Sequence, residues 1–252
     1  MTPSIELTVE GHRATLTLLR EAAHNRLGEA DLQRLEALIE QIDAQTDIRV
    51  AILTGSGTKC FSAGFEIDEI ESADWEENQF ERTVRRLEAA RPVVICALNG
   101  SVYGGACELA LACDFRIGVI GMELRLPPAA LGLVYFASGL KRIVSRIGLG
   151  AAKRLLLTGE RMNGETLLNI GFLDRLVEPE ALAGECDALA ARIAALSPRA
   201  VEGMKGLLND IAAGELDDAA ARQTALDSFR SEDAKEGIRA FKEKRAPRFT
   251  GR

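Results

Sequence analysis

Hydrophobic and polar residues alternate in two short segments near the start of the chain. The segments are residues 4–9 (Ser-Ile-Glu-Leu-Thr-Val) and residues 13–19 (Arg-Ala-Thr-Leu-Thr-Leu-Leu), and Glu10, Gly11 and His12 lie between them. A period of two is typical of a half-buried strand, and a short glycine-containing connection is typical of a hairpin turn. The pattern predicts that the chain opens with two strands joined by a hairpin.

Helical spacing and short apolar runs then alternate along the chain. The spacing predicts helices over residues 31–43, 74–91 and 106–113, and the runs predict buried strands over residues 50–53, 93–98 and 115–119. Glycine-rich loops follow two of these strands, at residues 54–57 and 99–105. Alternating strands and helices indicate an α/β core, whose ligands usually bind at loops beyond the strand ends.

After about residue 136 the pattern becomes almost entirely helical. Amphipathic helices are predicted over residues 140–147, 151–157, 165–170, 179–196, 198–212, 216–229 and 234–244, with one strand at residues 175–177. We therefore expect a core over residues 1–195 and a helical region over residues 196–252. Because no Pro/Ser-rich linker separates the two parts, we expect them to pack together.

Composition excludes several classes of protein. The 252 residues carry 31 Lys and Arg against 38 Asp and Glu, with a net charge of -7 and 5% aromatic residues, which argues against a nucleic-acid partner. The longest uncharged stretch, residues 92–107, is shorter than the roughly 18 residues that a membrane span needs, so we expect no membrane.

The cysteines and histidines do not predict a metal site. The chain has two histidines and five cysteines without a C-x-x-C pair, at Cys60, Cys96, Cys107, Cys113 and Cys186. The first residues lack the basic and apolar segments of a secretory signal. We therefore expect a cytoplasmic protein with reduced cysteines.

Small residues form the first candidate binding loop, which follows the strand at residues 50–53. Within residues 59–67 (Lys-Cys-Phe-Ser-Ala-Gly-Phe-Glu-Ile), Ser62, Ala63 and Gly64 would let a ligand approach the main chain. They can also leave the N–H group of Phe65 pointing into a cleft. The alternative is a simple loop crossing with Gly64 in a left-handed conformation.

The second glycine-rich segment, residues 99–114, leads into a predicted helix (Asn-Gly-Ser-Val-Tyr-Gly-Gly-Ala-Cys-Glu-Leu-Ala-Leu-Ala-Cys-Asp). Gly104 and Gly105 place unpaired N–H groups at the start of that helix, where the helix dipole favours negative charge. Glu108 is the one residue within residues 106–113 that is Asp, Glu, Lys, Arg or His. Burial would raise its pKa toward neutrality, as a proton donor or acceptor requires, whereas its place in the first turn favours the charged form. The alternative is a solvent-facing glutamate.

Together these loops resemble those of the crotonase superfamily, the enoyl-CoA hydratase/isomerase family. The resemblance extends to residues 24–27 (His-Asn-Arg-Leu), 156–159 (Leu-Leu-Thr-Gly) and 236–249 (Glu-Gly-Ile-Arg-Ala-Phe-Lys-Glu-Lys-Arg-Ala-Pro-Arg-Phe), so it covers essentially the whole chain. It implies an α/β fold of the ClpP/crotonase type, a spiral of ββα units with a helical trimerisation region at the C-terminus. It also implies a homotrimer or a dimer of trimers.

The resemblance assigns roles to particular residues. In this family two main-chain N–H groups form an oxyanion hole for the thioester oxygen of an acyl-CoA, and the matching residues are Phe65 and Gly105. Such donors stabilise the negative charge that an enolate oxygen gains during reaction. The implied substrate is an acyl-CoA thioester, with no metal and no cofactor beyond the CoA moiety. The implied substrate-binding residues are Ala63, Gly64, Ile67, Gly104, Pro127 and Leu131.

Two further contacts with CoA are implied by the same resemblance. The carbonyl of Ala63 would meet the adenine, and the basic residues Lys242, Lys244 and Arg245 would approach the phosphates of a neighbouring subunit's ligand. A basic helix end is also explained by compensation of the helix dipole, so this second role has a simple alternative.

The chain departs from the hydratases at one position. Hydratases of the family use two glutamates to hold and split water, because adding water across a double bond needs a general base and a general acid. Glu108 matches the first glutamate, whereas Pro128, which has no titratable group, stands at the position of the second. Ordinary hydration is therefore not expected, although Glu108 alone could shuttle a proton.

A local resemblance to methylmalonyl-CoA decarboxylase fits this departure. Residues 131–135 (Leu-Gly-Leu-Val-Tyr) are similar to a segment in which a tyrosine at the position of Tyr135 lies in the active site. Decarboxylation of a malonyl thioester needs an oxyanion hole and an oriented carboxylate, but no pair of acids. The residue after Gly64 is a histidine in that decarboxylase and Phe65 here. The alternative for Tyr135 is a packed tyrosine with its hydroxyl at the rim.

We therefore predict an acyl-CoA enzyme that stabilises a thioester enolate, with Glu108 transferring the proton and Tyr135 orienting the acyl group. Three interpretations of its activity stay open. They are decarboxylation of a malonyl-type CoA ester, hydration or isomerisation of an enoyl-CoA by Glu108 alone, and binding of CoA esters without catalysis.

Overall fold

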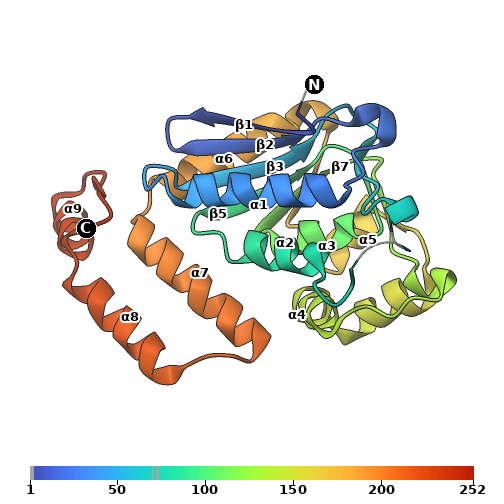
Figure 1. Cartoon of the computed structure of the whole chain (residues 1–252). Coiled ribbons are helices and arrows are strands. Elements are labelled where there is room, and N and C mark those ends of the chain that lie inside the picture. The colour runs from blue at the N-terminus through green and yellow to red at the C-terminus, as the bar shows by residue number, and fades with distance from the viewer. Residues whose placement is uncertain (1–2, 70, 72–73) are drawn as a thin grey trace.

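The computed structural model describes residues 3–69, 71 and 74–252, and a six-stranded sheet forms its centre (Figure 1). The strands follow the order β1 (Ile5–Glu10), β2 (Arg13–Leu18), β3 (Val50–Gly55), β5 (Val93–Leu98), β7 (Phe115–Val119) and β10 (Arg175–Val177). The β1–β2 hairpin is antiparallel and the other neighbours are parallel. The predicted hairpin and all four further predicted strands are confirmed.

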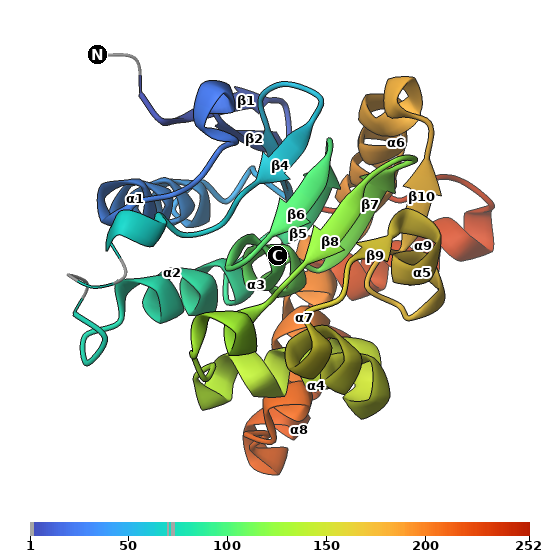
Figure 2. The same ribbon diagram turned by 90° about the vertical axis from the view of Figure 1, so that its right-hand side faces the viewer.

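A second sheet lies beside the first and was not predicted. Its order is β4 (Cys60–Ser62), β6 (Ser101–Tyr103), β8 (Glu123–Arg125) and β9 (Met162–Asn163). Figure 2 shows β4, β6 and β8 side by side, each arriving directly after one strand of the larger sheet. The prediction of a single strand after residue 136 is wrong, because β9 also forms. Strands of two or three residues are too short to carry a periodic pattern.

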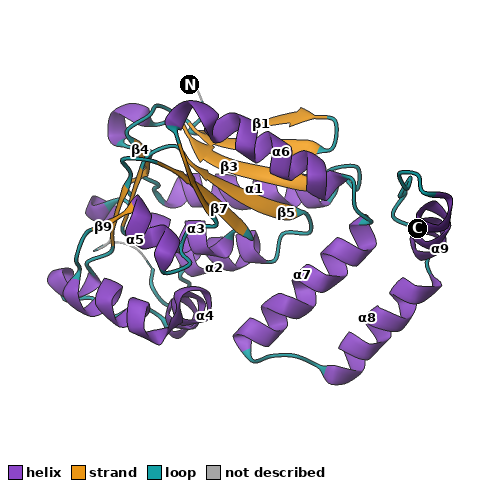
Figure 3. Cartoon of the chain, turned by 180° about the vertical axis from the view of Figure 1, so that it is seen from behind, coloured by secondary structure: helices purple, strands orange, loops and turns teal. Residues whose placement is uncertain are grey.

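Helices cover both faces of the larger sheet. α1 (Glu29–Asp43) lies on one face and α6 (Leu182–Ala194) on the other (Figures 1 and 3). α1 forms as predicted because its apolar residues recur on one stripe, which is buried in the core at Leu32, Leu35, Leu38, Ile39 and Ile42. Repetition of a strand, a short strand and a helix gives the ββα units of a crotonase fold.

Three helices surround the ends of the short strands: α2 (Gln79–Glu88), α3 (Ala106–Ala112) and α4 (Ala137–Lys153). α2 is shorter than the predicted helix over residues 74–91, because the side chain of Asn78 caps it by accepting a hydrogen bond from the N–H of Glu81. Gly148 breaks the helical geometry of α4 with φ 74° and ψ 161°, which accounts for the two helices predicted there.

The C-terminal helices α7 (Pro198–Ala213), α8 (Asp218–Arg230) and α9 (Glu232–Glu243) lead away from the sheet (Figures 1 and 3). Lys205 ties α7 to the core, since its Nζ lies 2.8 Å from both the Pro92 carbonyl oxygen and Asp114 Oδ2. The three helices expose large apolar side chains at Met204, Leu208, Ile211, Phe229 and Phe241. A domain boundary at residue 195 stays a prediction.

Two further features bear on the expectations from sequence. All five cysteines are buried, and none of them forms a disulfide. Among the described residues, α-helices of the length and hydrophobicity that a bilayer span requires are absent.

A short helix, α5 (Gly164–Asn169), lies between β9 and β10 in sequence.

Candidate active site

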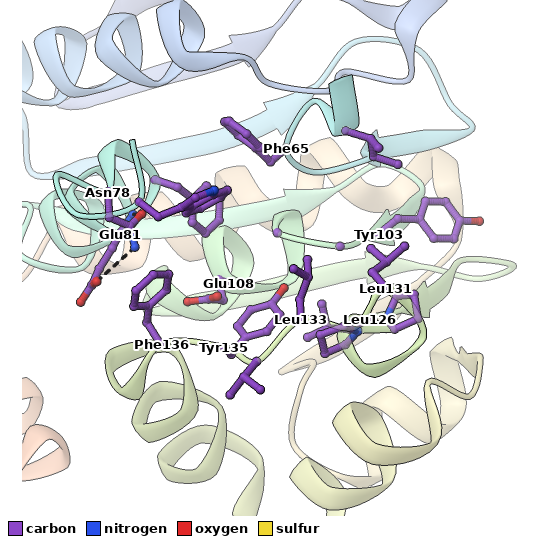
Figure 4. Close-up of a pocket in the computed structure, with 18 of the residues that line it drawn as sticks. Phe65, Asn78, Glu81, Tyr103, Glu108, Leu126, Leu131, Leu133, Tyr135 and Phe136 are labelled. Atoms are coloured by element: carbon purple, nitrogen blue, oxygen red, sulfur yellow. Dashed lines mark hydrogen bonds between the residues drawn. The ribbon is translucent and has the colours of Figure 1, made fainter. Parts of the chain in front are cut away.

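A cavity of about 460 Å³ lies where two glycine-containing loops, residues 59–67 and 99–105 (hereafter the two glycine-rich loops), meet the segment that precedes α4 (Figure 4). Every predicted site residue except Gly64 contributes to its wall: Ala63, Phe65, Ile67, Gly104, Gly105, Glu108, Pro127, Leu131 and Tyr135. Residues far apart in sequence therefore come together as expected. Gly64 lies immediately behind the wall, where it has a packing role.

Gly64 lets the two glycine-rich loops touch. Its φ of +88° belongs to the left-handed region that favours glycine. A Cβ atom on Gly64 would lie 2.7 Å from the nitrogen of Gly105 and 2.7 Å from the carbonyl oxygen of Tyr103. Because real Cβ atoms do not come so close, any other residue would force the loops apart. Ser62 supports the same turn, with its Oγ accepting a hydrogen bond from the Gly64 N–H at 3.1 Å.

Two residues that line the cavity, Phe65 and Gly105, are candidates to bind a ligand through their main-chain N–H groups. Phe65 follows β4 and Gly105 precedes α3, and a Cβ built on Gly105 would lie 3.7 Å from the nitrogen of Phe65, so the two residues are neighbours. Their glycine neighbours donate their N–H groups within the protein, Gly64 to Ser62 and Gly104 to the Arg125 carbonyl. Within residues 3–69, 71 and 74–252, the N–H groups of Phe65 and Gly105 have no acceptor.

Glu108 is buried at this wall, with 6% of its surface exposed. The alternative of a solvent-facing glutamate is therefore excluded. Burial raises the pKa of Glu108 to about 7, the charge of Arg142 opposes this rise, and the carboxylates of Glu81 and Glu88 add to it. Both the protonated and the ionised forms of the carboxyl group are therefore accessible near neutral pH, so it can donate or accept a proton.

The hydrogen-bond partner of the Glu108 side chain comes from α4 and was not predicted. Arg142 of α4 donates from Nη1 to Glu108 Oε2 at 3.2 Å, and it pairs with Glu88 of α2 at 2.8 Å. Gly139 packs against the same carboxyl group. No sequence signal identifies Arg142, because Arg142 precedes Ile143 in the helical pattern just as Arg146 precedes Ile147, and only the structure shows that Arg142 is buried.

Tyr135 lies beside Glu108 at the cavity wall (Figure 4). Burial raises the pKa of the phenol well above its usual value, and the nearby charge of Glu108 adds to this rise, so the hydroxyl stays protonated. Pro128, at the start of a short 3-10 turn, is buried in the same wall and brings no titratable group.

Aromatic side chains form a further part of the cavity that the sequence did not predict. The ring of Phe65 meets those of Trp75 and Phe80 edge to face, at centroid separations of 5.9 and 6.3 Å. Trp75 stacks on Phe136 at 6.3 Å. These rings come from three separate segments and make this side of the cavity apolar. Among the described residues, no group of His, Cys, Asp and Glu is arranged to hold a metal ion.

The ββα repeats and the glycine-rich cavity define a crotonase-fold acyl-CoA enzyme, and comparison with known proteins gives the family. The profile of the family described as enoyl-CoA hydratase/isomerase matches residues 10–252. The chain belongs to the enoyl-CoA hydratase/isomerase family.

Individual relatives agree with this assignment over their full length. The chain is 37% identical to YngF of Bacillus subtilis, whose name places it in the enoyl-CoA hydratase/isomerase family, with all of both chains covered. It is 32% identical to the short-chain-enoyl-CoA hydratase of Clostridium acetobutylicum, over 96% of this chain and 95% of that protein. The crystal structure of an enoyl-CoA hydratase from Bacillus anthracis superimposes with a TM-score of 0.90 at 31% identity, over 99% of this chain and all of that one.

Proposed function

We propose that this protein moves a proton to or from the carbon next to the thioester carbonyl of an enoyl-CoA, as a hydratase or isomerase that uses the single carboxyl group of Glu108. One observation carries the proposal. Glu108, whose carboxyl group is buried, lines the same cavity as Phe65 and Gly105, whose N–H groups have no acceptor among the described residues.

The two N–H groups would hold the thioester oxygen. When a proton leaves the neighbouring carbon, or a nucleophile adds to the double bond, negative charge moves onto this oxygen. Preorganised donors stabilise that charge without rearranging, and the loss of one donor typically costs about 2.7 to 4 kcal/mol of transition-state stabilisation. The dipole of α3, which begins directly after Gly105, acts in the same direction.

Glu108 would carry the proton. In isomerisation, its carboxylate takes a proton from C2 of a 3-enoyl thioester and returns it to C4 as the double bond moves to C2–C3, so the carboxyl group ends unchanged. In hydration, it takes a proton from water as the water oxygen bonds to C3, and gives that proton to C2. A pKa of about 7 favours both directions of transfer near neutral pH.

The two reactions differ in whether they need a second acid at position 128. Isomerisation needs one carboxyl group, which the cavity supplies at Glu108. Hydration by the usual pair of glutamates needs a second acid where Pro128 stands, so water addition would depend on Glu108 for both proton steps. The name of the Clostridium relative supports hydration as the reaction to test first.

Decarboxylation of a malonyl-type CoA ester is a second candidate, favoured by the neutral hydroxyl of Tyr135 beside Glu108. We rank decarboxylation second because the cavity is lined by acidic side chains, which disfavour a substrate carboxylate. Glu81 and Glu108 both line the wall, and the Nε of Arg125, a cation of the same wall, donates to the Gly159 carbonyl. A substrate carboxylate would therefore meet two carboxyl groups.

We further propose that the active form is a trimer or a dimer of trimers. Lys242, Lys244 and Arg245 lie at the end of α9, on the opposite side of the chain from α4 (Figure 1). They could reach the CoA phosphates of a cavity only in a neighbouring copy. Light scattering coupled to size exclusion tests the assembly, and a monomer that turns over substrate would contradict it.

Incubation with crotonyl-CoA and methylmalonyl-CoA in deuterated buffer, followed by mass spectrometry of the thioesters, tests the reaction. Added water means hydration, and deuterium exchange without added water means proton transfer of the isomerase kind. Loss of carbon dioxide from methylmalonyl-CoA alone would establish the second candidate. Binding of both thioesters without any change would identify a protein that binds CoA esters without catalysis.

Variants of Gly105 test the oxyanion hole. Gly105→Pro removes the N–H group, whereas Gly105→Ala keeps it. Both variants introduce a Cβ that would lie 2.8 Å from the ring of Phe80, so this steric effect is common to both. We expect Gly105→Pro to lower kcat/KM on the order of 100-fold or more below Gly105→Ala. Equal rates would remove the N–H group of Gly105 from the mechanism.

A further inference from the structure

We propose that Arg142 is a positioning residue that holds the carboxyl group of Glu108 at the cavity wall and, through its ion pair with Glu88, sets how readily that carboxyl group gives up its proton. The inference rests on the proposed role of Glu108 as the proton carrier. It adds two residues, Arg142 and Glu88, that lie outside the cavity lining.

The guanidinium of Arg142 is divided between two carboxyl groups. Its Nε and Nη2 donate to the two oxygens of Glu88 at 3.1 and 2.8 Å, and its Nη1 donates to Glu108 Oε2 at 3.2 Å. Because a guanidinium is planar, the two bonds to Glu88 fix the plane in which the third N–H points at Glu108. Arg142 is 5% exposed, so water competes little for these donors.

The same contacts place Glu108 in space. Gly139, one turn before Arg142 on α4, lies so close that a Cβ there would be 2.5 Å from Glu108 Oε2. The carboxyl group is therefore confined between the backbone of α4 and the guanidinium. A side chain held on two sides by one helix keeps a fixed distance to a substrate bound in the cavity.

The charged and titratable groups around Glu108 act in opposite directions. Glu81 and Glu88 face it from α2, and Tyr135 and Cys107 are its other titratable neighbours. Arg142 is the cation that favours the ionised form, against burial and the two carboxylates. Arg142 is also shared with Glu88, which holds it at the shorter distances. Glu88 thus raises the proton affinity of Glu108 in two ways, by its own charge and by drawing the guanidinium toward itself.

This arrangement predicts opposite effects for the two partners. Arg142→Met removes the cation, so Glu108 should titrate at a pH higher by about one unit or more. Glu88→Gln removes the competing carboxylate and frees the guanidinium for Glu108, so titration should move to lower pH. Arg142→Lys keeps the charge but loses the fork geometry, and its midpoint should fall between those of the wild type and Arg142→Met. Lys141→Met, which removes an exposed cation of the same helix, is the control and should leave the midpoint in place.

Infrared difference spectroscopy of the whole protein measures this titration without any substrate. The carbonyl stretch of the protonated Glu108 carboxyl group is assigned as the band that disappears in Glu108→Gln. Aspartate and glutamate side chains in water ordinarily titrate near pH 4, so a band that titrates near neutral pH stands apart. Opposite shifts in Arg142→Met and Glu88→Gln, with none in Lys141→Met, would support the proposal. Unchanged midpoints, or shifts in the same direction, would overturn it.

A fallback pair of variants and a kinetic pH profile complete the test. If Arg142→Met does not fold, Arg142→Lys and Glu88→Gln still have opposite expected shifts. In the pH profile of kcat, the limb that reports Glu108 should move with the infrared midpoint in each variant. A wild-type protein that turns over no thioester would defeat the proposed function, whereas the infrared titration would still decide the role of Arg142.

Discussion

The carboxyl group of Glu108 lies directly against the backbone of Gly139. A Cβ on Gly139 would be 2.5 Å from Oε2 and 2.9 Å from Oε1 of Glu108, closer than any real Cβ contact. A helix from a later part of the chain therefore holds the proposed proton carrier from one side, and it can do so because its residue at this point has no side chain.

Gly139→Ala is expected to displace Glu108 and lower kcat on the order of 100-fold, because a shift of about 1 Å in a catalytic group can have this effect. Gly150→Ala in the same helix is the control, since a Cβ there meets nothing within 4 Å. It should raise the free energy of unfolding by about 0.5 to 1 kcal/mol and leave kcat unchanged. Steady-state kinetics and urea unfolding measure both effects, and full activity of Gly139→Ala would contradict the close packing.

Gly64→Ala tests the contact between the two glycine-rich loops. Gly64 and Gly121 share a φ of +88°, but a Cβ on Gly121 meets nothing within 4 Å. Gly121→Ala is therefore the control: it has the backbone strain of a non-glycine residue at positive φ but no steric clash. We expect Gly121→Ala to lose about 1 to 2 kcal/mol of stability with normal kinetics. Gly64→Ala should lose more stability and also lower kcat/KM by about 100-fold or more, because it displaces the N–H of Gly105. Identical behaviour of the two variants would rule out a special role for Gly64.

The stability of the protein should depend on the protonation of Glu108. Its pKa is about 7 in the folded protein, against an ordinary value of 4.5, so the folded state binds more protons than the unfolded state between these pH values. The free energy of unfolding therefore falls as pH rises from about 4.5 to about 7, by about 3 kcal/mol from this group. Glu108→Gln has no titrating group at this position. The free energy of unfolding of this variant, relative to that of the wild type, should therefore increase between about pH 4.5 and pH 7. Urea unfolding at pH 5 and pH 8 measures the difference, and a constant difference would contradict the shifted pKa.

Pro128→Glu is expected to add water-splitting capacity. It places a second carboxyl group opposite Glu108, at the position where the resemblance to hydratases implies one. We expect hydration of crotonyl-CoA to rise on the order of 100-fold above Pro128→Gln, which has nearly the same size and no acid. Because Pro128 is buried, both variants should also lower Tm. Equal hydration by the two variants would show that the missing acid at this position is not what limits water addition.

The sequence by itself determined most of the elements and the identity of the proposed proton carrier. The strands of the larger sheet and the helix α1 have periodic apolar residues, and period is a local property of the chain. Glu108 could be identified because it interrupts a run of small and apolar residues, and the glycines of both loops mark close backbone approaches that a sequence displays directly.

Tertiary structure alone decided how the site is completed. Arg142 and Glu108 are 34 positions apart, Arg142 and Glu88 are 54 apart, and the rings around Phe65 come from three segments. The short strands β4, β6 and β8 exist because neighbouring ββα units pair with one another. Such contacts produce no periodic pattern in the sequence, because their energy comes from burial and charge pairing between segments that are far apart along the chain. The proton affinity of Glu108 is set by these contacts, so it follows from the fold and not from the residue type.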